Sequence, residues 1–354
     1  MSGNDPKTAQ TQSYILVPAR EVADDTLRAF AVSILPESPP ERILQAWWRR
    51  ANPSCAVVAM HEATGELAGI CVGRPSEWLV GGKRHPAVAI CGWYVAPDHA
   101  GRRLGHRLVR HFEAPDRLLY AYSISNEAVR SFVRLGWVGP YTSSLLALPL
   151  PRVAQLAHAM LMRNPELTFA DHAVDTPVLP EALGADLDRI EQHIPPGAPA
   201  QMRRGSEEWS WRLSVCGERR YRFSVVSRSG APVGYVAVRR MARGANRILG
   251  NRAAIVTDLV TSSNDSAVLR ALIVRAVAFA VELGAAAILT STTIASHRNG
   301  YEALGFLSSS MPVLGRPLQR RAPQFMWQAK GPAAALAAKT IALSFSDSDV
   351  DLNL

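Results

Sequence analysis

The amino-acid sequence predicts an α/β (α+β) protein built from two successive domains of similar design. With 354 residues, the chain exceeds the size at which single hydrophobic cores stop growing, about 250 residues. The order strand, loop, helix, strand, helix occurs once in each half. Each half closes that order with the same pattern, Leu135-Gly136-Trp137 in the first and Leu304-Gly305-Phe306 in the second.

The centre of the first half is a buried strand followed by a basic loop and a helix. Residues 88–97 are an apolar run that closes at Pro97-Asp98, as a buried strand does. Gly101-Arg102-Arg103-Leu104-Gly105 follows, and apolar residues then recur at helical spacing up to position 112. Such a junction presents free backbone N–H groups and the positive end of a helix to an anion. A phosphorylated cofactor is the expected ligand, and the alternative is a basic surface turn.

The next two elements complete the first half. Residues 118–124 form a second apolar run of strand length, and residues 126–137 have the pattern of a helix. Gly136 stands where a left-handed C-terminal cap is needed.

These segments together resemble the GCN5-related N-acetyltransferases (GNAT). The family pattern is a strand ending Val-x-Pro, an Arg/Gln-x-x-Gly-x-Gly loop, a helix, a strand and then Asn…Ala…Tyr-x-x-x-Gly-Phe. The residues that match it in order and spacing are Val95, Pro97, Gly105, Leu108, Asn126, Ala128 and Leu135-Gly136-Trp137. Ala100 and Arg103 depart from it, because they replace the Arg/Gln and the first loop glycine.

The resemblance implies a mixed, mostly antiparallel sheet flanked by helices, and transfer of an acyl group from a coenzyme A thioester to an amine. Backbone N–H groups at the end of the central strand would hold the pantetheine and the thioester carbonyl, and the loop amides would hold the pyrophosphate. The implied cofactor-binding residues are Tyr94, Val95, Gly101, Arg102, Arg103, Leu104, Gly105, His106 and Asn126.

The acid and base of such a reaction are less evident. The position of the family's usual tyrosine acid is Phe132, and residues 90–93 offer no glutamate as a base. Tyr94, Tyr122 and Tyr141 are the available tyrosines, and we predict Tyr141 as the general acid that protonates the thiolate. The alternative is a half-buried strand tyrosine with a solvated hydroxyl.

Two further positions border the predicted site. His99 lies beside the loop, where it either touches phosphate or is a solvated loop histidine. The acceptor pocket is expected to include the helix over residues 43–50, with its adjacent Trp47 and Trp48.

The second half repeats the first in a degenerate form. A hairpin over residues 221–238 turns at Ser229-Gly230, and a strand, a long helix and a strand follow over residues 255–290. The loop at residues 262–268 has no glycine and carries Asp265, whose charge would repel a pyrophosphate. Tyr301 stands where the first half has Phe132.

The predicted organisation follows from this repeat. A cofactor-binding domain spans residues 12–150, a linker 151–180, a degenerate domain 181–330, and a C-terminal strand with an acidic tail 331–354.

Composition limits the partners. The net charge of +9 favours anionic ligands, but the arginines are spread out along the chain. Those from Arg219 to Arg252 are interpreted as a solvated strand face, so no nucleic-acid partner is expected.

The cysteines, Cys55, Cys71, Cys91 and Cys216, indicate neither a disulfide framework nor a metal site. Residues 276–294 are predicted as a helix and a strand rather than a membrane span, and the polar N-terminus lacks a signal peptide. A cytoplasmic location is therefore expected.

The hypothesis from sequence is an acyl-CoA-dependent N-acyltransferase, most simply an N-acetyltransferase that uses acetyl-CoA and a small-molecule amine. Two alternatives stay open. One is an aminoacyl transferase of the tandem type that takes amino acids from tRNA, and the other is a catalytically inactive sensor that binds acyl-CoA.

Overall fold

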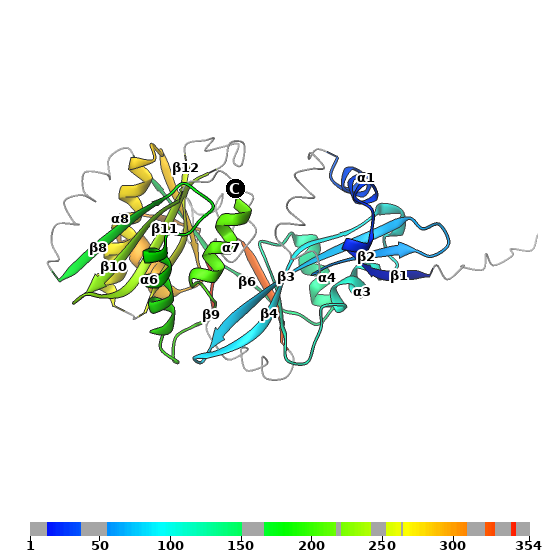
Figure 1. Cartoon of the computed structure of the whole chain (residues 1–354), viewed down its shortest axis with the longest axis horizontal. Coiled ribbons are helices and arrows are strands. Elements are labelled where there is room, and N and C mark those ends of the chain that lie inside the picture. The colour runs from blue at the N-terminus through cyan, green and yellow to red at the C-terminus, as the bar shows by residue number, and fades with distance from the viewer. Residues whose placement is uncertain are drawn as a thin grey trace, which may run out of the picture. The chain divides into compact units, whose positions relative to one another are not determined.

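The computed structural model describes residues 13–36, 55–150, 166–216, 221–241, 253–262, 265–309, 323–329 and 341–344. They form two mixed sheets flanked by helices, which confirms the predicted fold class (Figure 1). The chain divides into two compact units, Met1–Pro75 with Ile90–Glu113 and Ser76–Ala89 with Ala114–Leu354. The long strands β3 (Leu67–Val80) and β4 (Lys83–Val95) contribute residues to both.

The first unit consists of a small antiparallel sheet and the helices next to it. Its further elements are β1 (Tyr14–Pro18), η1 (Ala19–Glu21), α1 (Asp24–Ile34), β2 (Ala56–His61), η3 (Pro97–His99) and α3 (Leu104–Arg110). β2 pairs with β1 and with β3, in both cases antiparallel. Leu27 and Phe30 of α1 belong to the same buried cluster as Val58 of β2 and Ile70 of β3, so α1 covers this sheet with its apolar face.

The second unit begins with the remaining elements of the first half, β5 (Leu118–Tyr122), α4 (Asn126–Arg134) and β6 (Val138–Thr142). β5 pairs in parallel with β4 over Leu118–Tyr120. The Ser125 hydroxyl caps α4 by accepting the Ala128 N–H. Gly136 has a φ of +79°, the left-handed cap that the sequence predicts.

The second sheet has the strand order β14-β7-β13-β12-β11-β10-β8. Its strands are β7 (Ser144–Pro149), β8 (Leu167–Val174), β10 (Tyr221–Arg228), β11 (Ala231–Arg240), β12 (Ala253–Thr261), β13 (Ala287–Thr292) and β14 (Leu307–Ser308). β12 and β13 run parallel, and the other neighbours are antiparallel. The predicted hairpin turn is confirmed, because Ser229 and Gly230 both have positive φ, 51° and 80°.

Helices flank this sheet, and their apolar residues pack against it to form the core. They are α6 (Glu181–Gln192), α7 (Ser206–Cys216), α8 (Ser266–Glu282) and α9 (Ala295–Ala303), and the short strands β9 (Ala200–Met202) and β16 (Ile341–Ala342) pair with one another. Leu272 and Ile273 of α8 are fully buried against the sheet. The apolar stretch 276–294 forms the end of α8 and then β13, the helix and strand that the sequence predicts. No helix among the described residues is long and apolar enough to span a bilayer.

The two halves exchange a strand. β7 follows β6 in the chain, yet it pairs with β13 and β14 of the second sheet. β15 (Gln324–Ala329) follows the second half, yet it pairs with β5 and β6 of the first. Both exchanged strands lie within the second unit. The sheets therefore do not follow the division of the sequence near residue 150.

The arginine-rich stretch from residue 219 is not a solvated face throughout, which corrects that interpretation. Arg239 is completely buried, and its Nη1 donates to the Arg240 carbonyl at 3.0 Å. Arg228 forms an ion pair of 2.6 Å with Asp265. These arginines are used in packing and pairing on the second sheet.

Candidate active site

The predicted phosphate-binding loop connects the end of β4 with α3. Gly101 has a φ of +79°, and Arg103 is the N-cap of α3 with φ 57° and ψ 14°. Arg103 thus adopts the left-handed backbone that normally favours glycine. The first N–H groups of an α-helix have no acceptor within the helix. Leu104, Gly105 and His106 form the first turn of α3, directly after this left-handed residue.

Two glycines bring α3 close to the sheet. A Cβ on Gly105 would stand 2.8 Å from Trp93 Nε1 and 2.9 Å from a ring carbon. A Cβ on Gly69 of β3 would stand 3.0 Å from both the Leu108 side chain and the Tyr94 carbonyl oxygen. Gly105 is therefore required for packing against the Trp93 indole, a reason that the sequence pattern does not reveal.

Tyr14, at the start of β1, holds the two arginines next to the loop. Arg102 Nη1 donates to the Tyr14 hydroxyl at 2.8 Å, and Arg107 Nη2 donates to the Tyr14 carbonyl at 2.9 Å. The same hydroxyl lies 3.0 Å from His99 Nδ1. His99 is 6 % exposed, so the alternative of a solvated loop histidine is wrong. Sequence reasoning missed Tyr14, because nothing in the chain links it to a loop more than 80 residues away.

The remaining predicted residues are divided between the units. Tyr94 is partly buried against the core of the first unit, and Val95 is half-buried beside it. Asn126 and Tyr141 belong to the second unit. Asn126 Oδ1 accepts from Gln324 Nε2 at 3.1 Å, and Tyr141 is 42 % exposed on β6. The structure thus gathers residues 94–106 in one unit and places Asn126 and Tyr141 in the other.

Phe132 takes part in the core. It is buried, and its ring centroid lies 4.1 Å from that of Trp137. Among the tyrosines considered as the general acid, Tyr122 has a buried hydroxyl group. Its oxygen lies 3.1 Å from both Ser143 Oγ and Ser291 Oγ. Tyr122 is therefore the tyrosine with a defined hydrogen-bond network, whereas Tyr141 faces solvent.

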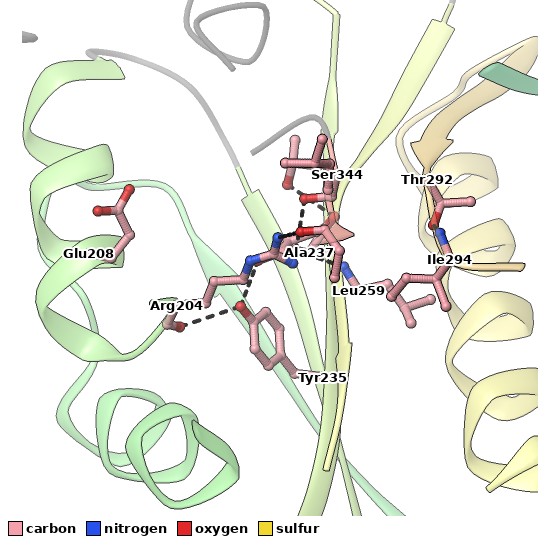
Figure 2. Close-up of polar contacts among 12 residues, drawn as sticks. Arg204, Glu208, Tyr235, Ala237, Leu259, Thr292, Ile294 and Ser344 are labelled. Carbon is pink, nitrogen blue, oxygen red and sulfur yellow. Dashed lines mark hydrogen bonds and ion pairs between the residues drawn. The ribbon is translucent and has the colours of Figure 1, made fainter. Parts of the chain in front are cut away.

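In the second half, β12 and β13 separate, and other parts of the chain lie between them. Their parallel ladder covers Ala253–Ile255 and Ala287–Leu289. Beyond it, Arg204 and the segment 341–344 lie beside both strands (Figure 2). The Thr293 hydroxyl donates to the Ile341 carbonyl and accepts from the Leu343 N–H at 2.9 Å. The acidic residues after position 344 lie outside the described residues.

A buried ion pair fixes this arrangement. Arg204 Nη1 donates to Asp258 Oδ1 at 2.7 Å, and the two side chains are 6 % and 1 % exposed. Tyr235 and Ser344 donate to the same carboxylate at 2.7 and 3.1 Å, and they surround Arg204 in Figure 2. The Leu259 N–H also donates to Asp258. The space that opens between the parallel strands of the second half is therefore filled by side chains of the protein itself.

The second-half counterpart of the phosphate loop is used as a helix cap. Asp265 accepts from the N–H groups of Ala267 and Val268 at 2.8 and 3.3 Å, and it also pairs with Arg228. Tyr301, the counterpart of Phe132, is buried in the core, and this burial raises its pKa. Asp265 and Tyr301 are thus both engaged within the protein itself.

A cavity of about 280 Å³ lies next to this network. It is lined by the segment 195–201, the end of β12, the start of α9 and Ala342. His297 faces it, and burial together with the charge of Arg204 lowers the pKa of His297 to about 4. The imidazole is therefore neutral at pH 7. Sequence reasoning missed this cavity, and no motif near residue 297 signals it.

A larger cavity of about 440 Å³ lies beside the turn between β3 and β4. The carboxylates that line it already have partners in the protein. Glu191 accepts from Arg203 Nε at 2.8 Å, and Asp188 accepts from the N–H and hydroxyl of Ser206. The expected acceptor helix with Trp47 and Trp48 lies outside the described residues. Within the described ranges, no group of three or more acidic, histidine or cysteine residues is placed to hold a metal ion.

One protein-family model matches part of the first half. Residues 20–137 match the model of the acetyltransferase (GNAT) family. None of the curated proteins matches the chain.

Solved structures share the fold of the whole chain. A GCN5-related N-acetyltransferase from Anabaena variabilis aligns with a TM-score of 0.58 and 14 % identity, over 89 % of this chain and 72 % of that one. N-myristoyltransferase from Saccharomyces cerevisiae with bound myristoyl-CoA gives 0.51 and 12 %, over 92 % and 88 %. A tandem GNAT protein from the clavulanic acid biosynthesis pathway gives 0.51 and 14 %, over 90 % and 99 %. At this identity the likeness establishes the fold alone.

Proposed function

Residues 20–137 match the model of the GNAT acetyltransferase family, and from this match we propose that the protein is an acyl-CoA-dependent N-acyltransferase whose first half binds the acyl-CoA. The observation that carries the proposal is the loop between β4 and α3. The left-handed Arg103 precedes the first turn of α3, and Arg102 adds a guanidinium that Tyr14 holds. Backbone N–H groups and a guanidinium are the groups that bind a pyrophosphate.

The chemistry of the reaction makes few demands on side chains. The amine attacks the thioester carbonyl, a bond from nitrogen to carbon forms, and the carbon–sulfur bond breaks. The amine loses a proton, and the thiolate gains one as it leaves. By family resemblance, the N–H groups of Tyr94 and Val95 hold the pantetheine and the carbonyl. Tyr141 remains our proposed acid, and its exposure on β6 leaves its hydroxyl accessible to solvent.

We propose acetyl-CoA as the acyl donor and a small-molecule amine as the acceptor. The printed names of two structures with this fold support the donor class, since one holds myristoyl-CoA and another is a tandem GNAT protein. The competing function is an acyl-CoA sensor. It is favoured by Phe132, which is buried against Trp137 and has no proton to donate.

Calorimetric titration of acetyl-CoA into the protein tests the proposal. Arg103→Glu reverses a charge on the exposed loop, and we expect it to weaken binding at least tenfold. The matched control is Arg189→Glu, which changes an exposed arginine on α6, and it should bind as the wild type does. Gly105→Glu is unsuitable, because any side chain at position 105 meets Trp93.

Thiol release from acetyl-CoA with a panel of small amines, together with the loss of the amino acid from charged tRNA, then separates the functions. Release that depends on a small amine supports the acyltransferase. Binding without release by any acceptor supports the sensor, and release of an amino acid from tRNA supports the aminoacyl transferase. Absence of acetyl-CoA binding by the wild type contradicts the proposal.

A further inference from the structure

We infer that Tyr14 is a positioning residue for acyl-CoA binding, because its hydroxyl fixes the Arg102 guanidinium in the orientation that meets a cofactor phosphate. The inference rests on the proposed function and deepens it. Tyr14 lies on β1, outside the strand–loop–helix motif that defines the phosphate-binding loop.

The hydrogen bond between Arg102 and Tyr14 has one possible direction. Arg102 has only donors, so the Tyr14 oxygen accepts from Nη1. The same hydroxyl lies 3.0 Å from His99 Nδ1, and His99 Nε2 lies 3.8 Å from Glu66 Oε2. The Tyr14 hydroxyl therefore joins the Arg102 guanidinium to the buried His99 ring.

Tyr14 and His99 are held in place by burial. Tyr14 and His99 are 5 % and 6 % exposed, whereas Arg102 is exposed. The Tyr14 ring packs against the rings of His61 and His99, with centroids 5.4 and 5.6 Å apart. The His61 ring is in turn held by Thr64, whose hydroxyl lies 2.9 Å from His61 Nδ1. A rigid buried group thus contacts one end of a solvent-facing arginine.

Among the residues that the structure describes, the contact uses one part of the guanidinium and leaves the rest available. Nη1 meets the tyrosine, so Nη2 and Nε retain N–H groups on the other edge of the plane, the arrangement that binds a phosphate with two parallel hydrogen bonds. Fixing the side chain beforehand lowers the entropy that is lost on binding. Tyr14 also accepts from Arg107 of α3 through its carbonyl, so the loop and the helix after it share one support.

A double-mutant cycle tests whether Tyr14 acts through Arg102. Acetyl-CoA dissociation constants are measured for the wild type, Tyr14→Phe, Arg102→Ala and the double variant. We expect Tyr14→Phe to weaken binding about five- to tenfold, because it removes one hydrogen bond to a charged group. In the Arg102→Ala background the same substitution should have no further effect. Tyr301→Phe, which removes a buried hydroxyl of the second half, is the matched control and should bind as the wild type does.

Pantetheine separates positioning from a general structural role, because it has the arm of coenzyme A without the phosphates. Its affinity should be the same in wild type and Tyr14→Phe. Equal weakening of pantetheine and acetyl-CoA binding, or an undiminished effect of Tyr14→Phe in the Arg102→Ala background, would overturn the inference.

Arg102→Lys covers the case in which Tyr14→Phe does not fold. It leaves the buried pair of Tyr14 and His99 intact, but an ammonium group cannot hold the tyrosine and a phosphate with the geometry of a guanidinium. Affinity should fall toward that of Arg102→Ala, and wild-type affinity contradicts the inference. Binding by the wild type with no change in Tyr14→Phe overturns this inference alone, whereas absence of binding by the wild type overturns the proposed function as well.

Discussion

The backbone of Gly105 lies against the indole of Trp93, so closely that a methyl group on Gly105 would stand 2.8 Å from Nε1. The contact sets how near α3, and with it the predicted phosphate-binding loop, approaches β4. The loop's position therefore depends on the packing of Gly105 against Trp93, in addition to any contact that Gly105 makes with a ligand.

Gly105→Ala is expected to lower the free energy of unfolding by about 1–3 kcal/mol, the usual cost of overpacking. Chemical denaturation measures the change. Gly197→Ala is the control, since a Cβ there meets no atom within 4 Å, and its stability should match that of the wild type. Adding Trp93→Phe to Gly105→Ala should recover part of the loss, because the smaller ring leaves room for the methyl group. A Gly105→Ala protein as stable as the wild type contradicts this account.

Asp258→Asn is expected to destabilise the protein by about 3–5 kcal/mol, because it leaves the buried Arg204 charge without its partner. Urea unfolding of the full chain measures this. Glu127→Gln is the comparison, since Glu127 and Arg130 form an exposed pair 3.6 Å apart and its loss should have no measurable effect. If the two variants are equally stable, Asp258 does not hold the second half together.

The pH dependence of stability should contain a contribution from His297. The pKa of His297 is about 4 in the folded protein, because burial and the Arg204 charge disfavour the imidazolium, whereas the ordinary pKa of a histidine is 6.5. Between these values the unfolded chain binds more protons than the folded one, so stability falls as the pH is lowered from about 6.5 to 4. His297→Gln should make the unfolding free energy flatter over this window. An unchanged pH profile in the variant contradicts the low pKa.

Acetyl-CoA should bind with a stoichiometry of one per chain. In the second half, Arg204 and the segment 341–344 lie between the separated strands, and Asp265 is engaged as a helix cap. Calorimetry gives the number of sites directly. Two equivalent sites would show that the segment 341–344 leaves the second half and that the loop at Asp265 accepts a phosphate.

The elements of both halves are predictable from sequence, because their cores follow local periodicity. The apolar run before Pro97 and the helical spacing after Leu104 predict β4 and α3, and Gly136 and Gly305 end helices with positive φ. The hydrophobic pattern of a buried strand is the same whichever strand it pairs with. The sequence of residues 144–149 therefore does not indicate that this strand belongs to the second sheet.

The tertiary contacts that hold the candidate site in place are harder to predict from the sequence. Tyr14 and Arg102 meet only because β1 and the loop fold together, and neither residue belongs to a local pattern with the other. The segment 341–344 lies far along the chain from β12 and β13. The loop itself was found because it is continuous, whereas its contacts arise from tertiary packing.

The strand exchange has a consequence for how the chain folds. β15 completes the first sheet from a position after the strands of the second, and β7 joins the second sheet from a position before its other strands. During synthesis, the edges of β5 and β6 that pair with β15 stay unpaired until residues 324–329 have been made, and pairings between such distant segments form slowly. Neither half can complete its sheet as a separate fragment. The two halves are thus expected to mature together, in one late cooperative step, and a chain cut near residue 150 would expose two incomplete sheets to aggregation.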